Sequence, residues 1–141
     1  KNKVAVVCGI LSGTLASLTG IFVLCMLFGF NHQQYVTMLP KSITTAIGIG
    51  ISEELGGIVT ITVAVIIITG ILGNVIADTV FHIFKIKNPL AKGLALGTAS
   101  HAIGTARAIE MGPVEGAMSS LAVAVAGLLT VVFVSGFAQL I

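Results

Sequence analysis

Three long apolar stretches dominate the pattern of this chain, at residues 4–30, 58–84 and 114–141. The only charged residues inside them are Asp78 and Glu115, which lie near the ends of their stretches. A helix needs about 20 apolar residues to cross a bilayer, and each stretch is longer than that. The second stretch is rich in β-branched residues, but an open strand in lipid would leave its backbone groups unpaired. The pattern therefore predicts three transmembrane helices.

Two polar, glycine-interrupted inserts separate these stretches, at residues 39–57 and 93–113. Both contain the pattern A-I-G-x5-E-[LM]-G, which begins at Ala46 in the first insert and at Ala102 in the second. In each case an apolar stretch follows at once. Paired polar interruptions at corresponding positions of a membrane chain are typical of the binding site of a transporter.

The lysines indicate how the chain crosses the membrane. Lys1 and Lys3 precede the first apolar stretch, and Lys85, Lys87 and Lys92 follow the second. Basic residues next to a span favour the cytoplasmic side. An even number of crossings must then separate the two groups, so we expect the first insert to enter and leave the membrane on one face.

The length of the first insert agrees with such a re-entrant hairpin. We read Asn31 to Gln34 as a polar loop, Pro40 as a helix start and the span from Pro40 to Gly56 as two arms of about eight residues, which reach about 12 Å, near the membrane midplane. The second insert follows a helix start at Asn88 and enters from the cytoplasmic side.

The resulting fold class is an all-α polytopic membrane protein, with one membrane domain over residues 1–141. Three long transmembrane helices carry two re-entrant or discontinuous helical inserts, which form the inverted repeats of an elevator-like transporter. Discontinuous helices that cross the membrane completely are the alternative to hairpins.

The composition supports a membrane protein and argues against other classes. Of the 141 residues 56% are hydrophobic and 9% are charged, far fewer charges than in a soluble domain. The net charge of +2 includes no basic patch of the kind that binds nucleic acid. Ser100 and His101 are adjacent and point about 100° apart on a helix, so they do not form a nucleophile–base pair. We expect no enzyme, no metal ligand cluster and no cofactor.

The inserts offer chemistry suited to a small anion. Ionisable residues at membrane depth are costly unless paired or functional, and hydroxyls, helix N-termini and a cation together suit a hydroxy- or keto-monocarboxylate. Arg107 is the first candidate for the carboxylate because it can bind both oxygens, and Lys41 is the second. The candidate substrate-binding residues are Lys41, Ser42, Thr44, Thr45, Thr98, Ser100, His101, Thr105 and Arg107.

Proton coupling is a further hypothesis. His101 titrates near neutrality, and Glu54 or Glu110 would assist it. The alternative is a neutral His101 that only hydrogen-bonds a backbone carbonyl. Asp78 and His82 lie four residues apart on one helical face, and we interpret them as a capping or interfacial pair rather than a site.

Several segments resemble the LrgB/CidB membrane family, which includes the plastid glycolate/glycerate translocator. They are PKSITTAIGIGISEELGG from Pro40, IITGILG from Ile67, and GLALGTASHAIGTARAIEMG from Gly93, continued by VEGAMSSLA. The resemblance implies that this chain is the C-terminal part of a longer LrgB-type protein. The family motif residues in the first insert are Pro40, Lys41, Ser42, Thr44 and Thr45. In the second insert they are Gly97, Thr98, Ser100, His101, Gly104, Thr105, Arg107 and Glu110.

The resemblance implies two functions. One is transport of a small monocarboxylate such as glycolate, glycerate or pyruvate. The alternative is a holin-like or antiholin-like regulator of murein hydrolase export and autolysis, with a small membrane partner of the LrgA/CidA type. Either way we expect a multi-pass protein of the bacterial inner membrane that contacts the lipid bilayer, forms a homo-oligomer and binds no nucleic acid.

Overall fold

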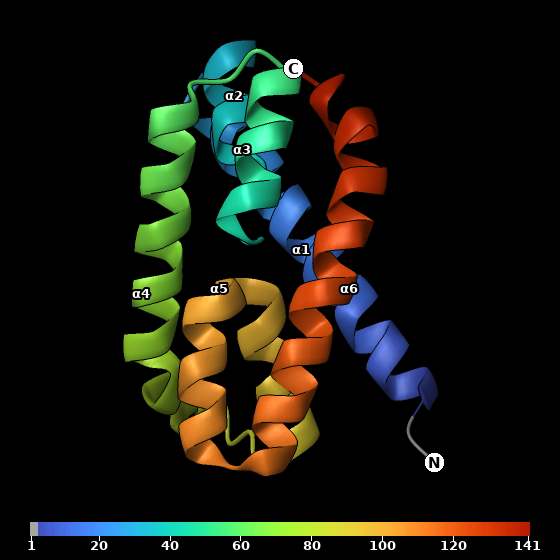
Figure 1. The fold of residues 1–141 in the computed structure, drawn as a ribbon. Coiled ribbons are helices and arrows are strands. Elements are labelled where there is room, and N and C mark those ends of the chain that lie inside the picture. Colours follow the sequence, from blue (N-terminus) through green and yellow to red (C-terminus); the bar gives the residue numbers. More distant parts are fainter. Residues whose placement is uncertain (1–2) are drawn as a thin grey trace.

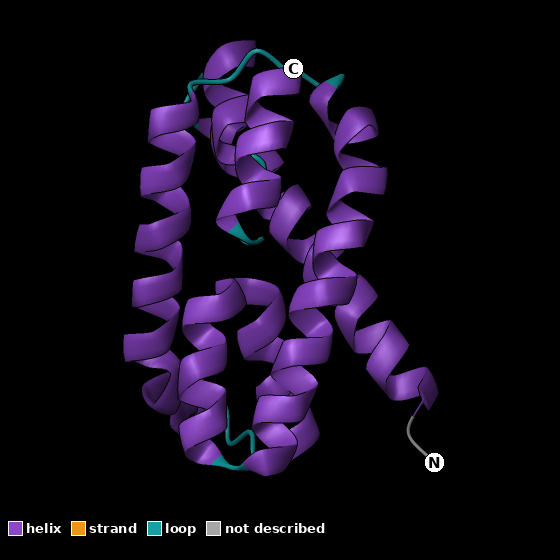
Figure 2. Ribbon diagram, viewed as in Figure 1, coloured by secondary structure: helices purple, strands orange, loops and turns teal. Residues whose placement is uncertain are grey.

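The structure is a computed structural model that describes residues 3–141. Across those residues the chain forms six helices and no strand (Figures 1 and 2). Their bounds are α1 Lys3–Leu27, α2 His32–Met38, α3 Thr45–Glu54, α4 Val59–Ile83, α5 Pro89–Met111 and α6 Pro113–Ala138. Lys1, which contributes to the orientation argument, lies outside the described residues.

Three of these helices are long and apolar enough to cross a membrane, namely α1, α4 and α6. They coincide with the three apolar stretches, so this prediction is confirmed. Along α4 a row of large apolar side chains faces outward, including Ile68, Leu72 and Val75. Such exposure in a soluble domain would be unfavourable, whereas in a membrane it faces lipid at no cost.

Helix α5 is a hairpin of two helical arms. Its backbone leaves the helical conformation at His101, with φ 42° and ψ −138°. A Cβ added to Gly104 would lie 2.9 Å from the carbonyl oxygen of Leu96. Eight residues of a straight helix would separate these positions by about 12 Å, so the chain reverses at His101. The second arm then returns to the end from which the first arm came (Figure 1).

The first hairpin differs from its prediction in where it begins and turns. Residues 31–34 do not form a loop, because Asn31 and Gln34 make a capping box that starts α2. Pro40 does not start a helix. It lies beyond the end of α2, since it has no backbone N–H to continue the hydrogen-bond series. The chain turns over residues 39–44, and α3 runs back.

Gly48 and Gly50 of the glycine-interrupted first insert lie inside α3 and do not break its helix. A Cβ on Gly48 would clash with the side chain of Ile66 on α4, so close packing of α3 against α4 explains this glycine. The first hairpin therefore covers residues 32–54, and the second covers residues 89–111.

The two hairpins approach each other from opposite ends of the molecule, and their tips point toward each other near its middle (Figure 1). The start of α1 and the α4–α5 loop, which carries Lys85 and Lys87, lie at the same end. The end of α6 and the start of α2 lie at the other end, where His32 Nδ1 is 2.9 Å from the backbone oxygen of Ile141. This arrangement agrees with an even number of crossings between the lysine groups.

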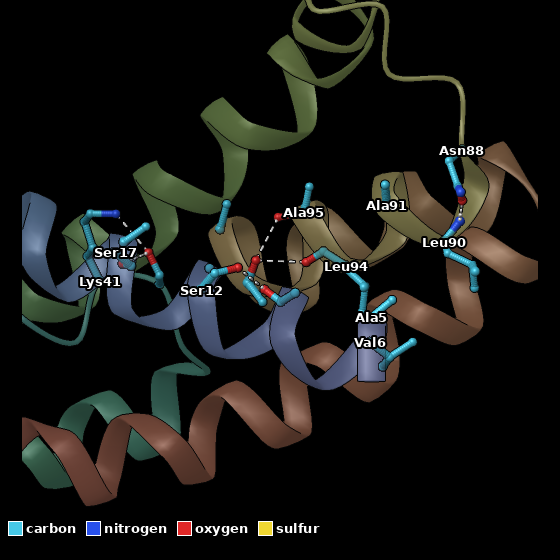
Figure 3. A pocket seen from close by; sticks show the side chains of 16 residues that line it. Ala5, Val6, Ser12, Ser17, Lys41, Asn88, Leu90, Ala91, Leu94 and Ala95 are labelled. Atoms are coloured by element: carbon cyan, nitrogen blue, oxygen red, sulfur yellow. Dashed lines mark hydrogen bonds between the residues drawn. The ribbon is translucent and has the colours of Figure 1, made fainter. Parts of the chain in front are cut away.

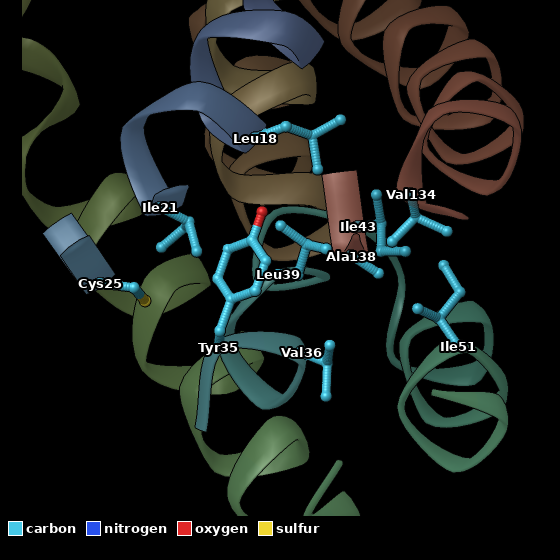
Figure 4. Packing of buried hydrophobic residues seen from close by; sticks show 10 residues of the cluster. All are labelled: Leu18, Ile21, Cys25, Tyr35, Val36, Leu39, Ile43, Ile51, Val134 and Ala138. Atoms are coloured by element: carbon cyan, nitrogen blue, oxygen red, sulfur yellow. The ribbon is translucent and has the colours of Figure 1, made fainter. Parts of the chain in front are cut away.

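The largest buried cluster fixes the first hairpin against α1 and α6. Its ten residues are Leu18, Ile21, Cys25, Tyr35, Val36, Leu39, Ile43, Ile51, Val134 and Ala138 (Figure 4). Tyr35 lies inside this cluster and its Oη donates a hydrogen bond of 2.9 Å to the carbonyl of Phe137. Burial of this much aromatic and aliphatic surface holds the hairpin in place.

Hydroxyls attach the outer part of the first hairpin to α4. Thr62 Oγ1 on α4 donates to the carbonyl of Thr37 at 2.9 Å and lies 2.8 Å from Ser52 Oγ of α3. Thr37 Oγ1 in turn accepts from the backbone N–H of Ile58 at 2.8 Å. Because all three hydroxyls have hydrogen-bond partners, their burial leaves no polar group unpaired.

Glycines on α4 make room for the tip of the second hairpin. A Cβ on Gly73 would overlap Ser100 Oγ, and a Cβ on Gly70 would lie 2.8 Å from His101 Cε1. Asn74 Nδ2 donates a hydrogen bond of 3.0 Å to the carbonyl of Ile103 just past the tip. The GxxG spacing on α4 thus seats the reversal of α5.

Candidate functional site

The tip of the first hairpin presents Lys41 and Ser42 to the middle of α1. Lys41 Nζ donates to Ser42 Oγ at 2.8 Å, and Ser17 Oγ of α1 donates to the same oxygen at 2.9 Å. Ser42 is buried and Lys41 is partly buried. Among residues 3–141 no carboxylate forms an ion pair with Lys41. The tip therefore holds a positive charge without an acidic partner.

Thr44 and Thr45 lie where α3 begins. Thr44 is the N-cap residue, but its side chain makes no capping hydrogen bond. The first backbone N–H groups of a helix have no partner within the helix and attract anions. Both threonines are partly buried, so the tip combines an amine, hydroxyls and a helix N-terminus.

His101 forms the tip of the second hairpin. Its side chain is 3% exposed, and its Nε2 lies 2.9 Å from the carbonyl oxygen of Ile66 on α4. A positive φ is rare for a residue with a Cβ and costs about 1–3 kcal/mol, and such strain clusters at functional sites. His101 therefore fixes both the reversal of α5 and its position on α4.

The hydroxyls of the second insert bond mainly to its own backbone. Thr98 Oγ1 donates to the carbonyl of Leu94 at 2.8 Å, and Thr105 Oγ1 donates to the carbonyl of His101 at 2.9 Å. Thr105 Oγ1 also lies 2.8 Å from Ser119 Oγ of α6. Ser100 is buried against α4 beside the tip. Of these residues, Thr98 lines a small cavity together with Ser42 of the first tip.

Arg107 does not join the two tips. Its guanidinium pairs with Asp78 of α4, and its Nη1 donates to Glu110 Oε2 at 2.7 Å. The side chain is 33% exposed, and both carboxylates are more exposed. The pairing of Asp78 with Arg107 replaces the expected pairing of Asp78 with His82, since α5 folds back alongside α4.

The three residues of the proton hypothesis, His101, Glu54 and Glu110, make no hydrogen bond or ion pair with one another. Glu54 is exposed at the end of α3, and Glu110 is occupied by Arg107. The ring of His101 bonds a backbone carbonyl, which is the contact that the alternative interpretation expects. The structure therefore brings neither carboxylate to His101 by a hydrogen bond.

A cleft of about 860 Å³ leads to the first tip from the side of the molecule. It runs between α1 and the first arm of α5, with Lys41 and Ser17 at one end and Leu90 and Asn88 at the other (Figure 3). Its walls are mostly small residues, such as Gly13 and Ala95. The cleft is large enough for a small organic anion.

Sequence reasoning missed the part of the site that α1 contributes. Ser17 lies in an apolar stretch whose small residues are typical of helix packing, and only the fold brings it to Ser42. Asp78 was assigned a local partner instead of Arg107. Among the described residues no three His, Cys, Asp or Glu side chains lie close enough together to hold a metal ion.

Comparison with known proteins gives a consistent family assignment. A family model described as "LrgB-like family" matches residues 1–140. "Antiholin-like protein LrgB" of Bacillus subtilis (strain 168) is 40% identical over 136 residues, which cover 96% of this chain and 59% of that protein. The protein of the same name from Bacillus cereus (strain B4264) is 42% identical over 128 residues, which cover 91% of this chain and 56% of that protein.

The chain therefore spans less than two thirds of the length of these relatives. No solved structure matches it.

Proposed function

This chain belongs to the LrgB-like family, and from that premise and the geometry of its hairpins we propose that it carries a small carboxylate anion across the membrane. The observation on which the proposal rests is the amine of Lys41, which lies at the inner end of the cleft without an acidic partner. A lone charge inside a membrane protein is costly unless an ion of opposite sign or water compensates it. A bound carboxylate would supply that compensation.

The groups around Lys41 suit a hydroxy- or keto-monocarboxylate such as glycolate, glycerate or pyruvate. The N-terminus of α3, four residues along the chain from Lys41, adds backbone N–H donors to the same hairpin tip. Ser17 Oγ gives its hydrogen to Ser42 but keeps a lone pair free, which can accept the hydrogen of a substrate hydroxyl. The small residues that line the cleft leave room for a compact ligand beside Lys41.

The arrangement of the hairpins supports an elevator-like mode of transport. Inverted repeats that meet near the middle of a membrane are a recurring design for carriers, with the substrate between them. We propose that both hairpins are re-entrant in the bacterial inner membrane, and that the protein acts as a homo-oligomer. Neither proposal depends on Arg107, which is occupied by Asp78 and Glu110.

Uptake of labelled glycolate and pyruvate by liposomes containing the full chain tests the proposal. Lys41→Gln removes a charge-assisted bond, so the apparent affinity should fall at least about 10-fold. Lys87→Gln on the exposed α4–α5 loop is the matched control and should behave like the parent. If Lys41→Gln transports with unchanged affinity, or the parent transports neither acid, this assignment is wrong.

The names of the relatives favour a second candidate function. Both are called antiholin-like proteins, so we also propose a regulator of murein hydrolase export and autolysis, acting with a small membrane partner of the LrgA/CidA type. On the comparisons alone this candidate is the better supported, and the geometry of Lys41 is what favours the carrier. The two activities differ in what they require of the first tip.

Lysis assays separate the candidates. Cells that produce the parent chain together with such a partner should lyse less than cells with the partner alone if the protein is a regulator. Lys41→Gln should retain this protection if regulation is independent of transport, and should lose it if protection arises from carrying an acid. Unchanged lysis with the parent chain would contradict the regulator.

A further inference from the structure

A small cavity lies behind the inner end of the cleft, where α1, the first tip, α5 and α6 meet. Its volume is about 10 Å³, close to the least space that one water molecule needs. Five hydroxyl-bearing residues line it, namely Thr14, Ser17, Ser42, Thr98 and Thr130. Ser17, Ser42 and Thr98 also line the cleft, so the cavity continues it.

Thr14 supplies an independent sign that this cavity binds something. The residue is 2% exposed, and its Oγ1 has no hydrogen-bond partner among residues 3–141. A buried hydroxyl without a partner costs about 1–3 kcal/mol, and the great majority of such groups in folded proteins are paired. A ligand in the cavity would pair it.

The other hydroxyls define what that ligand must offer. Thr98 Oγ1 donates its hydrogen to the carbonyl of Leu94 at 2.8 Å, and Thr130 Oγ1 donates to the carbonyl of Ala126 at 2.7 Å. Each of these two oxygens keeps lone pairs free, so each can accept. Ser42 Oγ accepts from both Lys41 and Ser17, which leaves its own hydrogen to donate.

We infer that this cavity binds a single water molecule. Water can accept from Ser42 and Thr14 and donate to Thr98 and Thr130, which matches the free donors and acceptors of the lining. A metal cation cannot accept the hydrogen of Ser42, and the amine of Lys41 on the same oxygen repels it. An anion has no hydrogen for Thr98 and Thr130, and the cavity is too small for an organic ion.

The water would connect the two hairpins. Ser42 belongs to the first hairpin and Thr98 to the second, and among the described residues no direct hydrogen bond joins the two hairpins. By receiving the Ser42 hydrogen, the water also keeps the lone pairs of Ser42 turned toward Lys41. This role does not depend on whether the protein is a carrier or a regulator.

Thermal unfolding of the full chain in detergent tests the inference. Thr14→Val keeps the shape but removes the hydroxyl, so the water loses a partner and the Tm should fall by about 3 °C or more. Thr14→Ser keeps the hydroxyl and loses one buried methyl group, so its Tm should lie above that of Thr14→Val. Thr19→Val, on an exposed position of α1, is the matched control and should change little.

An empty cavity predicts the opposite result. Thr14→Val would then remove an unsatisfied hydroxyl, and the Tm would stay the same or rise. A stabilisation by Na⁺ that K⁺ does not reproduce, and that Thr14→Val abolishes, would identify a cation and overturn the water. If Thr14→Val does not fold, a density map of the parent that resolves ordered waters decides: a peak between Thr14, Ser42, Thr98 and Thr130 supports the inference, and its absence refutes it.

Discussion

His101 Nε2 lies 2.9 Å from the carbonyl oxygen of Ile66, and this contact joins the tip of the second hairpin to the middle of α4. A carbonyl oxygen can only accept, so Nε2 must carry the hydrogen. That leaves Nδ1 as the nitrogen that can gain or lose a proton. The same residue adopts φ 42°, so one side chain determines where α5 reverses and where the reversal rests.

The strained backbone of His101 predicts an unusual order of stability among its variants. Both variants lose the hydrogen bond of the His101 ring, but glycine tolerates a positive φ whereas alanine keeps the strain. His101→Gly should therefore exceed His101→Ala by about 1 kcal/mol or more in the free energy of unfolding. Ala102→Gly, in the regular helix next to it, should instead lose about 0.5–1 kcal/mol. Chemical denaturation measures both, and a His101→Ala variant at least as stable as His101→Gly would contradict the prediction.

Proton coupling predicts a dependence of uptake on the pH gradient. A carboxylate that enters a negative interior works against about 2.3 kcal/mol per 100 mV, which a co-transported proton offsets. If His101 Nδ1 carries that proton, a more acidic exterior should accelerate uptake into liposomes. His101→Gln should lose this acceleration but retain exchange of substrate for substrate. Equal acceleration in the variant and the parent would show that His101 serves only to hold the tip.

The two cationic candidates for the substrate carboxylate predict opposite results for Arg107→Lys. If Arg107 binds the carboxylate with both nitrogens, this variant should lose affinity although the charge is retained. If Arg107 only pairs with Asp78 and Glu110, the substrate affinity should stay within about two-fold. The loss of such exposed ion pairs changes the stability of the fold little. Direct binding measurements with glycolate and pyruvate distinguish the two, with Lys41→Arg as the comparison at the tip.

Gly73 on α4 predicts a local packing defect when it gains a methyl group. The Cβ would overlap Ser100 Oγ, so Gly73→Ala should cost about 1–3 kcal/mol of stability through overpacking. Gly50→Ala in α3 has open space around its Cβ and should gain up to about 1 kcal/mol. Thermal unfolding of the two variants should thus shift in opposite directions. Equal stability of the Gly73 variant and the parent would mean that the α5 tip does not sit on α4 in this way.

The opposite directions of the hairpins predict the accessibility of their bases. Gln34 at the start of α2 and Asn88 at the start of α5 lie at opposite ends of the molecule (Figure 1). Single cysteines at these positions, in a background without Cys8 and Cys25, should react with an impermeant thiol reagent from opposite faces of the membrane. Labelling of both from one face would rule out the inverted arrangement.

The sequence by itself determined the parts of this protein that depend on local pattern. Long apolar stretches specify α1, α4 and α6, because a helix that buries its own backbone groups is the form such a stretch takes in lipid. Asn88 and Pro89 mark the start of α5 for a similar reason, since an N-cap followed by proline is a local signal. The repeat of A-I-G-x5-E-[LM]-G likewise marks the second half of each hairpin.

Only the tertiary structure decided which residues meet. Arg107 is the better carboxylate ligand by chemistry, yet the fold places Asp78 beside it, and Lys41 is left without an acidic partner. In the sequence Ser17 and Thr14 are indistinguishable from residues that pack helices together. The fold places them beside the first tip, where α1 crosses it. The sequence shows Gly48 only as an interruption of the first insert, whereas its close contact with α4 is what requires a glycine. These pairings join positions far apart in the chain, and they depend on the packing angles of whole helices rather than on any local pattern.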